Sequence, residues 1–387
     1  MPVPHAEAVV DLQAITANAR RLKKAAGAAE LMAVVKADGY GHGAAPAARA
    51  ALAGGATVVG VATLPEAIAI RAAGIDAPLV AWLWAPGEDV RSAIAVGTQV
   101  TVSSRQQLRA VIDAADSAPF VPPADGAPEL KPGCVAIHVK VDTGMARNGV
   151  MPEDLPALLA DISAAQHDGT VRMVGLMSHL ACADVPSDPS VEVQIRAFRT
   201  AIDATEAAGL RPRWRHLANT AATLAVPAAH FDMVRCGIGL YGLSPLADRY
   251  DLLPAMTMRT HVALTKRVES GQGVGYGLTY HTDTPTLLAL VPVGYGDGIP
   301  RGSGNRGEVF LAGRRRRIVG RVSMDQIVVD CGDGAVHAGD EVLLFGSGTR
   351  GEPTADDWAG YCDTINYEVV TRISPRVTRR YVGGPEF

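Results

Sequence analysis

Eight short apolar segments alternate with segments of helical spacing between residues 31 and 235, and this alternation limits the fold more than any other feature. Continuous apolar runs of this length are typical of parallel strands that are covered on both faces. They lie at residues 31–36, 57–62, 78–82, 99–102, 135–141, 171–178, 213–217 and 233–235. Eight strand–helix units predict an α/β fold with a closed parallel (β/α)8 barrel, the TIM barrel.

The segments between these runs show the helical period of apolar residues, and several begin with a capping residue or an early proline. The predicted helices are residues 11–26, 44–53, 65–73, 89–95, 104–115, 152–166, 191–208 and a short one after Asn219. Residues 116–133 contain five prolines and predict an exposed irregular loop without a role in a site.

The pattern changes near residue 244, where short runs are separated by Gly and Asp turns. These runs, at residues 262–268, 287–293, 308–311, 327–330 and 341–345, are an all-β signature. We therefore expect a barrel over residues 10–243 and a mainly β domain over residues 244–387, with residues 1–9 packing against the β domain. Four arginines at 314–317 predict a solvated hairpin rather than a nucleic-acid site.

The composition excludes several classes of protein. With 387 residues, 48% hydrophobic and 20% charged, the chain is neither disordered nor membrane-spanning. A net charge of −4 gives no attraction for nucleic acid. The five cysteines are widely spread without a C-x-x-C pair, so we expect no disulfide framework and no metal site. Residues 1–7 lack the features of a signal peptide, which predicts a cytoplasmic protein.

Polar residues follow the predicted strands at their C-terminal ends, where barrel enzymes build their active sites. Glycines after the eighth strand allow backbone N–H groups to approach an anion closely. This predicts a phosphate pocket that faces a lysine. The polar residues are Lys36 and Tyr40 after the first strand, Arg147 and Asn148 after the fifth, His179 after the sixth, Asn219 and Thr220 after the seventh, and Arg235 at the end of the eighth.

Lys36 is the residue on which the chemistry depends. Burial lowers the pKa of a lysine toward the range in which its amine is a nucleophile, as a Schiff-base lysine requires. A lysine that extends to solvent at the barrel rim is the alternative. Likewise, His179 and Asn219 could be structural polar groups, and Arg147 could be ion-paired. Taken singly these residues leave both readings open, and their convergence on one face favours a site.

Eight stretches resemble those of alanine racemases in their order and in their residues. Alanine racemases are enzymes of fold type III that depend on pyridoxal phosphate. The resemblance runs from Val9 to Tyr381. Departures from the family pattern occur at Asp38-Gly39, Thr220, Gly275 and Ser323, and they leave the shape of the pocket open. The matching stretches are residues 34–43, 140–147, 216–221, 231–242, 275–277, 293–298, 320–326 and 365–368.

The resemblance implies a two-base mechanism, because racemisation removes a proton from one face of the α-carbon and returns one to the other. Lys36 would serve one face and Tyr276 the other. His179 would lower the pKa of Tyr276 and would itself be linked to Arg235, which would face the pyridine nitrogen. Arginine keeps its proton, so the ring nitrogen would stay largely unprotonated.

The resemblance also implies the remaining site residues. Tyr276, Tyr295, Met324 and Asp325 would reach the cofactor from a partner subunit, which implies a head-to-tail homodimer. Lys140 matches a lysine that is often carbamylated. Arg147 and Asp325 would support catalysis; Arg147, Met324 and Tyr295 would bind substrate; and the cofactor would be held by Lys36, Tyr40, Arg147, His179, Asn219, Thr220, Arg235, Gly237, Ile238 and Tyr367.

We therefore expect an enzyme that interconverts L- and D-alanine and supplies D-alanine for cell-wall peptidoglycan, without a nucleic-acid or membrane partner. One alternative is a racemase of the same fold with broader specificity, for example toward serine. A pyridoxal-phosphate decarboxylase or aldolase is another, but such enzymes do not need Tyr276 opposite Lys36. A carrier protein for the cofactor would lack the β domain.

Overall fold

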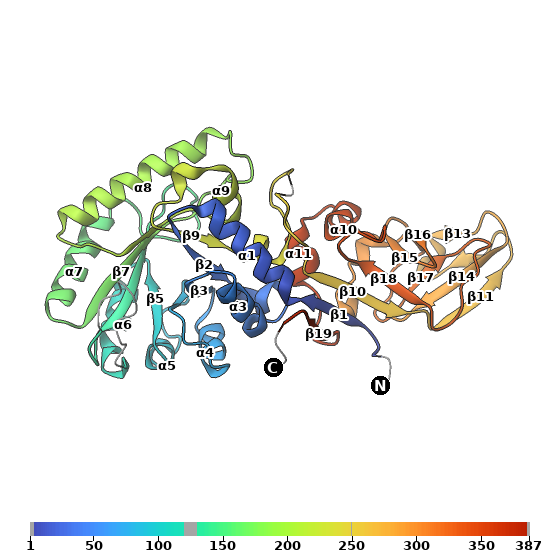
Figure 1. Cartoon of the computed structure of the whole chain (residues 1–387), viewed down its shortest axis with the longest axis horizontal. Helices are drawn as coiled ribbons and strands as arrows, with labels where there is room; N and C mark the ends of the chain where they lie inside the picture. Colours follow the sequence, from blue (N-terminus) through green and yellow to red (C-terminus); the bar gives the residue numbers. More distant parts are fainter. Residues whose placement is uncertain (1–3, 120–129, 249, 385–387) are drawn as a thin grey trace.

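The structure, a computed structural model, describes residues 4–119, 130–248 and 250–384. A barrel-like α/β domain and a mainly β domain lie end to end in an elongated molecule (Figure 1). None of the helices in the described residues has both the length and the apolar character needed to cross a bilayer. Of the proline-rich loop predicted at 116–133, residues 120–129 lie outside the described part of the chain.

Eight parallel strands form the barrel sheet, in the order β8-β7-β6-β5-β4-β3-β2-β9. β9 pairs with β2, and Asp232 N donates to Arg215 O at 3.0 Å, which links the segments of β8 and β9. The predicted barrel is therefore confirmed. Its strands are β2 (Glu30–Val34), β3 (Val58–Val61), β4 (Leu79–Ala81), β5 (Thr98–Val102), β6 (Val135–Lys140), β7 (Val171–Met177), β8 (Trp214–His216) and β9 (Met233–Cys236).

Helices surround this sheet and begin at the side chains that cap them. Asp11 accepts hydrogen bonds from Gln13 N and Ala14 N, and Thr63 forms a capping box with Glu66. The helices are α1 (Leu12–Ala26), α2 (Lys36–Tyr40), α3 (Ala44–Ala53), α4 (Leu64–Ala72), α5 (Val90–Ala95), α6 (Arg105–Asp113), α7 (Leu155–His167), α8 (Pro189–Ala207) and α9 (Thr220–Ala225), with 3-10 turns at η1 (Ala115–Ser117), η2 (Pro227–Ala229) and η3 (Ile238–Tyr241).

The first strand of the barrel ends earlier than predicted. β2 stops at Val34, and Lys36 opens α2 instead of closing the strand. Ala37, Asp38 and Gly39 have φ values of 51°, 51° and 62°, so α2 is a left-handed turn. Such a conformation costs about 1–2 kcal/mol per non-glycine residue and therefore needs support from its surroundings.

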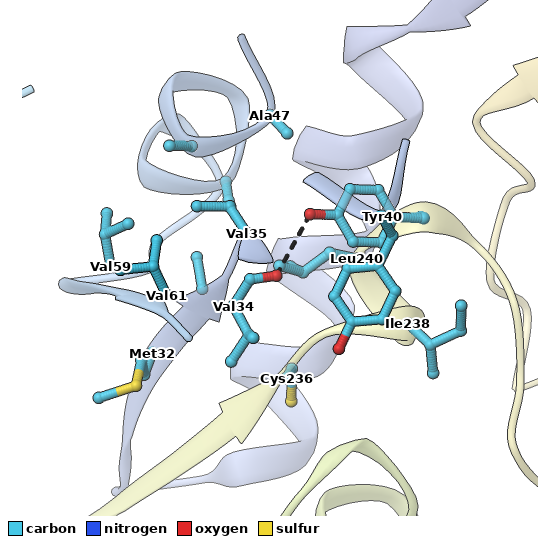
Figure 2. Close-up of a cluster of buried hydrophobic side chains, with 14 of the residues drawn as sticks. Met32, Val34, Val35, Tyr40, Ala47, Val59, Val61, Cys236, Ile238 and Leu240 are labelled. Carbon is cyan, nitrogen blue, oxygen red and sulfur yellow. Dashed lines mark hydrogen bonds between the residues drawn. The ribbon is translucent and has the colours of Figure 1, made fainter. Parts of the chain in front are cut away.

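Two carboxylates and the apolar core supply that support. Glu66 accepts a hydrogen bond from Ala37 N at 2.7 Å, and Asp38 accepts one from Ala44 N at 2.9 Å. Val34 packs in the core shown in Figure 2, and its carbonyl accepts the dashed hydrogen bond, from Tyr241 at 3.2 Å. These contacts hold the backbone of the turn that carries Lys36.

The β domain is built on a nine-stranded sheet in the order β11-β14-β17-β16-β15-β18-β10-β1-β19. The predicted runs correspond to β11, β14, β15, β17 and β18. Its elements are β1 (Glu7–Asp11), β10 (Met256–His261), β11 (Leu264–Val268), β14 (Thr286–Val291), β15 (Glu308–Leu311), β16 (Arg314–Val319), β17 (Ile327–Asp330), β18 (Glu341–Phe345), β19 (Thr378–Val382), the hairpin β12 (Gly273–Val274) and β13 (Tyr280–His281), helices α10 (Ala355–Cys362) and α11 (Asn366–Thr371), and the turns η4 (Tyr276–Leu278), η5 (Tyr295–Asp297) and η6 (Arg301–Ser303).

Strand β1, from the start of the chain, lies between β10 and β19 of the β domain. It pairs with β10 in antiparallel and with β19 in parallel orientation. The N-terminal strand is thus part of the C-terminal sheet, as the dark blue arrow in Figure 1 shows. The domain boundary at residue 244 stays a prediction.

The arginine run at 314–317 corrects one expectation. These residues form part of β16, which pairs with β15, and Arg316 is buried in the sheet. Its Nε donates to Leu311 O at 3.0 Å and its Nη1 to Cys331 O at 2.5 Å. The prediction of a fully solvated hairpin is therefore wrong for Arg316, because alternate residues of a strand point to opposite faces.

Candidate active site

A pocket of about 260 Å³ opens at the C-terminal ends of the barrel strands. It brings together the barrel residues singled out from the sequence except Asn148, which does not line it, and adds Val34, Trp82 and Met177. The predicted residues that line it are Lys36, Tyr40, Lys140, Arg147, His179, Asn219, Thr220, Arg235, Gly237, Ile238 and Tyr367.

The pocket is strongly cationic. Lys36, Lys140, Arg147 and Arg235 line it, and none of its lining residues in the described chain carries a carboxylate. Burial, and then the charge of Arg147, lowers the pKa of Lys36. Burial and the neighbouring cations leave the amine in its nucleophilic form more often than in water. The charges of Arg147 and Arg235, which oppose a proton on Lys36, also favour a bound anion.

Arg235 lies at the base of this pocket and is held by backbone carbonyls. Its guanidinium donates to Ser178 O at 2.6 Å and to His216 O at 2.7 Å. Burial lowers the pKa of Arg235 to about 10, which still leaves it protonated at neutral pH. Arg235 Nη2 also lies 3.2 Å from Nδ1 of His179.

His179 is neutral in this setting, because burial and then Arg235 lower its pKa well below the ordinary value. A guanidinium has no acceptor, so Arg235 must donate to Nδ1 of His179. We therefore assign the proton of the neutral ring to Nε2. His179 can then donate a hydrogen bond from Nε2 to an oxygen that enters the pocket.

A second chain of buried polar groups extends from Arg235 into the barrel, and sequence reasoning missed it. Arg235 Nη1 lies 3.3 Å from His216 Nδ1, His216 Nε2 lies 2.9 Å from His138 Nδ1, and His138 Nε2 lies 2.8 Å from Gln99 Oε1. Neutral rings that donate from Nε2 satisfy every contact in this chain. His138 lies two residues before Lys140 on β6, and residues two apart on a strand share a face. This spacing is the sequence signal that could have placed His138 near the site.

One part of the pocket, lined by Tyr40, Thr220, Gly237 and Tyr367, fits a phosphate group. Gly237 N donates to Thr220 Oγ1 at 3.1 Å, and a Cβ on Gly237 would lie 2.2 Å from the Tyr40 hydroxyl. Burial raises the pKa of both Tyr40 and Tyr367, so both phenols remain donors. Asn219 instead caps α9 by accepting from Ala222 N at 3.0 Å. Hydroxyl donors in a cationic pocket match the phosphorylated cofactor that the resemblance implies.

The residues expected from a partner subunit lie on the β domain, outside this pocket. Tyr276 is 71% exposed, Met324 54% and Tyr295 44%, and the Asp325 side chain is 52% exposed and bonded to Arg376. Tyr276 lines a separate cavity of about 740 Å³. A single chain therefore brings Lys36, His179 and Arg235 together but leaves Tyr276 apart from them.

Comparison with known proteins gives the family. Residues 10–245 match the N-terminal domain of alanine racemase and residues 255–381 its C-terminal domain. The alanine racemases of Salinispora arenicola and Thermobifida fusca are each 51% identical over 380 residues, covering 98% of both chains.

Solved structures agree over the full length. The alanine racemase of Streptomyces lavendulae superposes with a TM-score of 0.93 at 46% identity, covering 99% of this chain and 98% of that one. The alanine racemase of Bacillus anthracis with bound L-Ala-P gives a TM-score of 0.88 at 32% identity, covering 99% and 97%. The chain therefore belongs to the alanine racemase family, whose members depend on pyridoxal phosphate.

Proposed function

We propose that the chain racemises alanine with pyridoxal phosphate by a two-base mechanism, in which Lys36 and Tyr276 act on opposite faces of the α-carbon. The observation that carries this proposal is the half-buried Lys36, with its lowered pKa, in a cationic pocket that also holds hydroxyl donors suited to a phosphate. The Lys36→Ala and Tyr276→Phe experiments described in the Discussion test it.

The cofactor, when bound, withdraws electrons from the α-carbon and so acidifies its proton. Lys36 would hold the cofactor covalently at Nζ. Arg235 would face the ring nitrogen and, because it keeps its own proton, would leave that nitrogen without one. Arg147 would bind the substrate carboxylate and the phenolic oxygen, since guanidinium groups suit carboxylates. Tyr40, Thr220, Gly237, Ile238 and Tyr367 would hold the phosphate, beside Asn219.

Tyr276 would supply the second acid–base group. An ordinary tyrosine has a pKa near 10 and is a poor base at neutral pH. A hydrogen bond from Nε2 of His179 to the phenolic oxygen would stabilise the phenolate and lower the pKa of Tyr276. The contact between His179 and Arg235 supports this arrangement, since it fixes which ring nitrogen carries the proton.

The site would be completed by a second subunit. The loops at the barrel mouth expose Leu83, Met151 and Val185, and the β domain exposes Leu278 as well as Tyr276 and Met324. Exposed apolar side chains on two separate surfaces of one chain favour a head-to-tail dimer in which each covers the other. In that dimer Tyr276, Tyr295, Met324 and Asp325 would complete the partner's pocket.

Hybrid dimers test this sharing. We expect Lys36→Ala and Tyr276→Phe homodimers each to be inactive or nearly so. A hybrid of one Lys36→Ala subunit and one Tyr276→Phe subunit, purified by two different tags, contains one intact site and should regain about half of the wild-type activity per dimer. Hybrids that stay as inactive as the parents would show that each chain uses its own Tyr276.

Lys140 is proposed to carry a carbamate. Burial, and then Arg235 and Arg147, lowers the pKa of Lys140 to about 8. Its free amine would attack carbon dioxide, forming an N–C bond and releasing one proton from nitrogen. The product is an anion that would attract Arg147 and hold it in place.

The carbamate should be visible by carbon NMR. In cofactor-loaded enzyme at a fixed concentration of dissolved ¹³CO₂, a carbamate signal should grow as pH rises through about 8, since only the unprotonated amine reacts. The signal should be lost in Lys140→Arg, whose guanidinium stays protonated. A signal of equal size in Lys140→Arg would refute the assignment.

The proposed physiological role is the supply of D-alanine for cell-wall peptidoglycan, and the cytoplasmic location stays a prediction from the sequence. A screen of racemisation over alanine, serine and the basic amino acids would define the substrate range. We expect the enzyme to turn over alanine at least about tenfold more efficiently than serine. This is the margin expected when two substrates differ by one small group.

A further inference from the structure

Two loops of the β domain carry three of the four residues proposed to enter the partner's pocket. We call residues 294–298, which include Tyr295, the tyrosine turn, and residues 322–326, which include Met324 and Asp325, the carboxylate loop. Tyr295 N donates to Ser323 O at 3.1 Å, and Gly296 N donates to Met324 O at 2.8 Å. A Cβ on Gly294 would lie 2.2 Å from Ser323 O, so only glycine permits this approach.

Arg376 contacts both loops through two nitrogens of one guanidinium. Its Nη2 donates to Asp325 Oδ1 of the carboxylate loop at 2.8 Å, and its Nε lies 3.4 Å from Asp297 Oδ1 of the tyrosine turn. A Cβ on Gly296 would lie 2.5 Å from Arg376 Nη1, so the guanidinium packs directly on the turn. Arg376 itself lies between α11 and β19 and is fixed by backbone contacts of its own segment, where Ser374 N donates to Asp297 O at 3.2 Å.

The carboxylate of Asp297 explains why the bridge needs a charge. Its side chain is fully buried, and its Oδ2 accepts a hydrogen bond from Gly294 N at 2.9 Å. Its Oδ1 has no hydrogen-bond partner in the described residues and faces Arg376 and, at 3.7 Å, the imidazole of His5. A buried carboxylate is costly without a nearby opposite charge. Arg376, which is permanently cationic, therefore has an electrostatic reason to stay at the turn.

We propose that Arg376 is a positioning residue for substrate binding. By bridging Asp297 and Asp325, it sets the spacing between the tyrosine turn and the carboxylate loop, and so the positions at which Tyr295 and Met324 meet the substrate in the partner's pocket. This inference rests on the proposed function and its shared site. Arg376 touches neither Lys36 nor Tyr276, so it acts on the binding of alanine and leaves the proton transfers to those residues.

The variant Arg376→Gln keeps most of the side chain but removes the charge and one arm of the fork. We expect the KM for both alanine enantiomers to rise about tenfold while kcat stays within about twofold, because loosened loops misplace contacts to the substrate carboxylate. Cofactor content should not change, because the residues proposed to hold the cofactor do not include Arg376 or a residue of either loop. Arg376→Lys, which can meet only one carboxylate at a time, should give an intermediate KM.

Arg380→Gln is the matched control. Arg380 lies four residues further along, its side chain is 48% exposed against 47% for Arg376, and it also pairs with a carboxylate, Glu7 at 3.5 Å. Arg380 contacts neither loop, so the KM of the Arg380→Gln variant should equal that of the wild type. If Arg376→Gln does not fold, Arg376→Lys carries the same test, since it retains a positive charge beside Asp297. An unchanged KM in a folded, dimeric Arg376 variant overturns the inference.

Hybrid dimers separate positioning in the partner's site from damage within the same subunit. One hybrid combines a Lys36→Ala subunit with an Arg376→Gln subunit, so its single working barrel receives wild-type loops and should have the wild-type KM. The other combines a wild-type subunit with a subunit carrying both changes, so its working barrel receives altered loops and should show the raised KM.

The opposite pattern would show that Arg376 acts within its own subunit and would overturn the inference. Failure of the proposed function would look different, because the wild-type dimer would then not racemise alanine at all.

Discussion

Lys36→Ala should abolish covalent retention of the cofactor and lower alanine racemisation by at least about 10³-fold. The structure places Lys36 in a pocket without a lining carboxylate in the described residues, and burial and Arg147 lower its pKa. The same residue is proposed both to attach the cofactor and to move a proton at one face of the substrate. No other proposed group can replace it in both roles.

The measurement is the mass of the protein after reduction with borohydride, together with its yellow colour before reduction. Wild-type protein should keep the mass of the cofactor, and Lys36→Ala should not, although the cationic pocket should still bind the cofactor reversibly. Lys24→Ala, which alters an exposed lysine at the end of α1, is the control and should behave like wild type. Covalent cofactor on Lys36→Ala would refute the assignment.

Tyr276→Phe should stop exchange of the α-proton for deuterium from one alanine enantiomer while leaving exchange from the other. A positioned acid–base group contributes about 10²–10⁴-fold, so the loss for the affected enantiomer should fall in this range. Lys36 should continue to exchange the proton on its own face. The rates are measured by proton NMR, with L-alanine and D-alanine incubated separately in deuterated buffer.

The matched control for this experiment is Tyr280→Phe. Tyr280 is four residues from Tyr276, but its hydroxyl donates to Asp330 at 2.8 Å within the β domain. Its removal should leave the ratio of the two exchange rates unchanged. An equal loss for both enantiomers in Tyr276→Phe would contradict the two-base mechanism, because a single group would then serve both faces.

The barrel was predictable because its strands are buried on both faces and read as continuous apolar runs. The residues at which these strands end were harder to predict. Val35 and Lys36 continue the run at 31–36, yet the chain leaves the strand after Val34 and enters a left-handed turn. That turn depends on Glu66, a carboxylate 29 positions from Ala37, whose contact no local pattern contains.

The β domain was harder to predict from local pattern. β19 joins the sheet through β1, which lies about 370 positions earlier in the chain. In β19 no residue is buried, so the alternation that marks a strand is weak there. β16 shows the converse, since the buried Arg316 stands where the alternation leads one to expect an apolar residue.

Part of the site could be predicted only by resemblance. The period-2 spacing of His138 and Lys140 on β6 can be seen in the sequence. The link from His138 through His216 to Arg235 cannot, because it joins three strands. Tyr276 is the clearest case. Nothing in the 240 positions between Lys36 and Tyr276 indicates that they meet, and a single folded chain does not bring them together.

The position of β1 has a consequence for the synthesis of the protein. Ribosomes make β1 before its parallel neighbour β19, which follows about 370 residues later and therefore roughly 20 to 70 seconds later at typical translation rates. The edge of β1 that pairs with β10 stays open until β10 is made, and the edge that pairs with β19 stays open throughout the interval. A chain that terminates before Thr378 would keep that edge exposed, and unpaired strand edges promote aggregation. We therefore expect this chain to carry an exposed strand edge until β19 has been made.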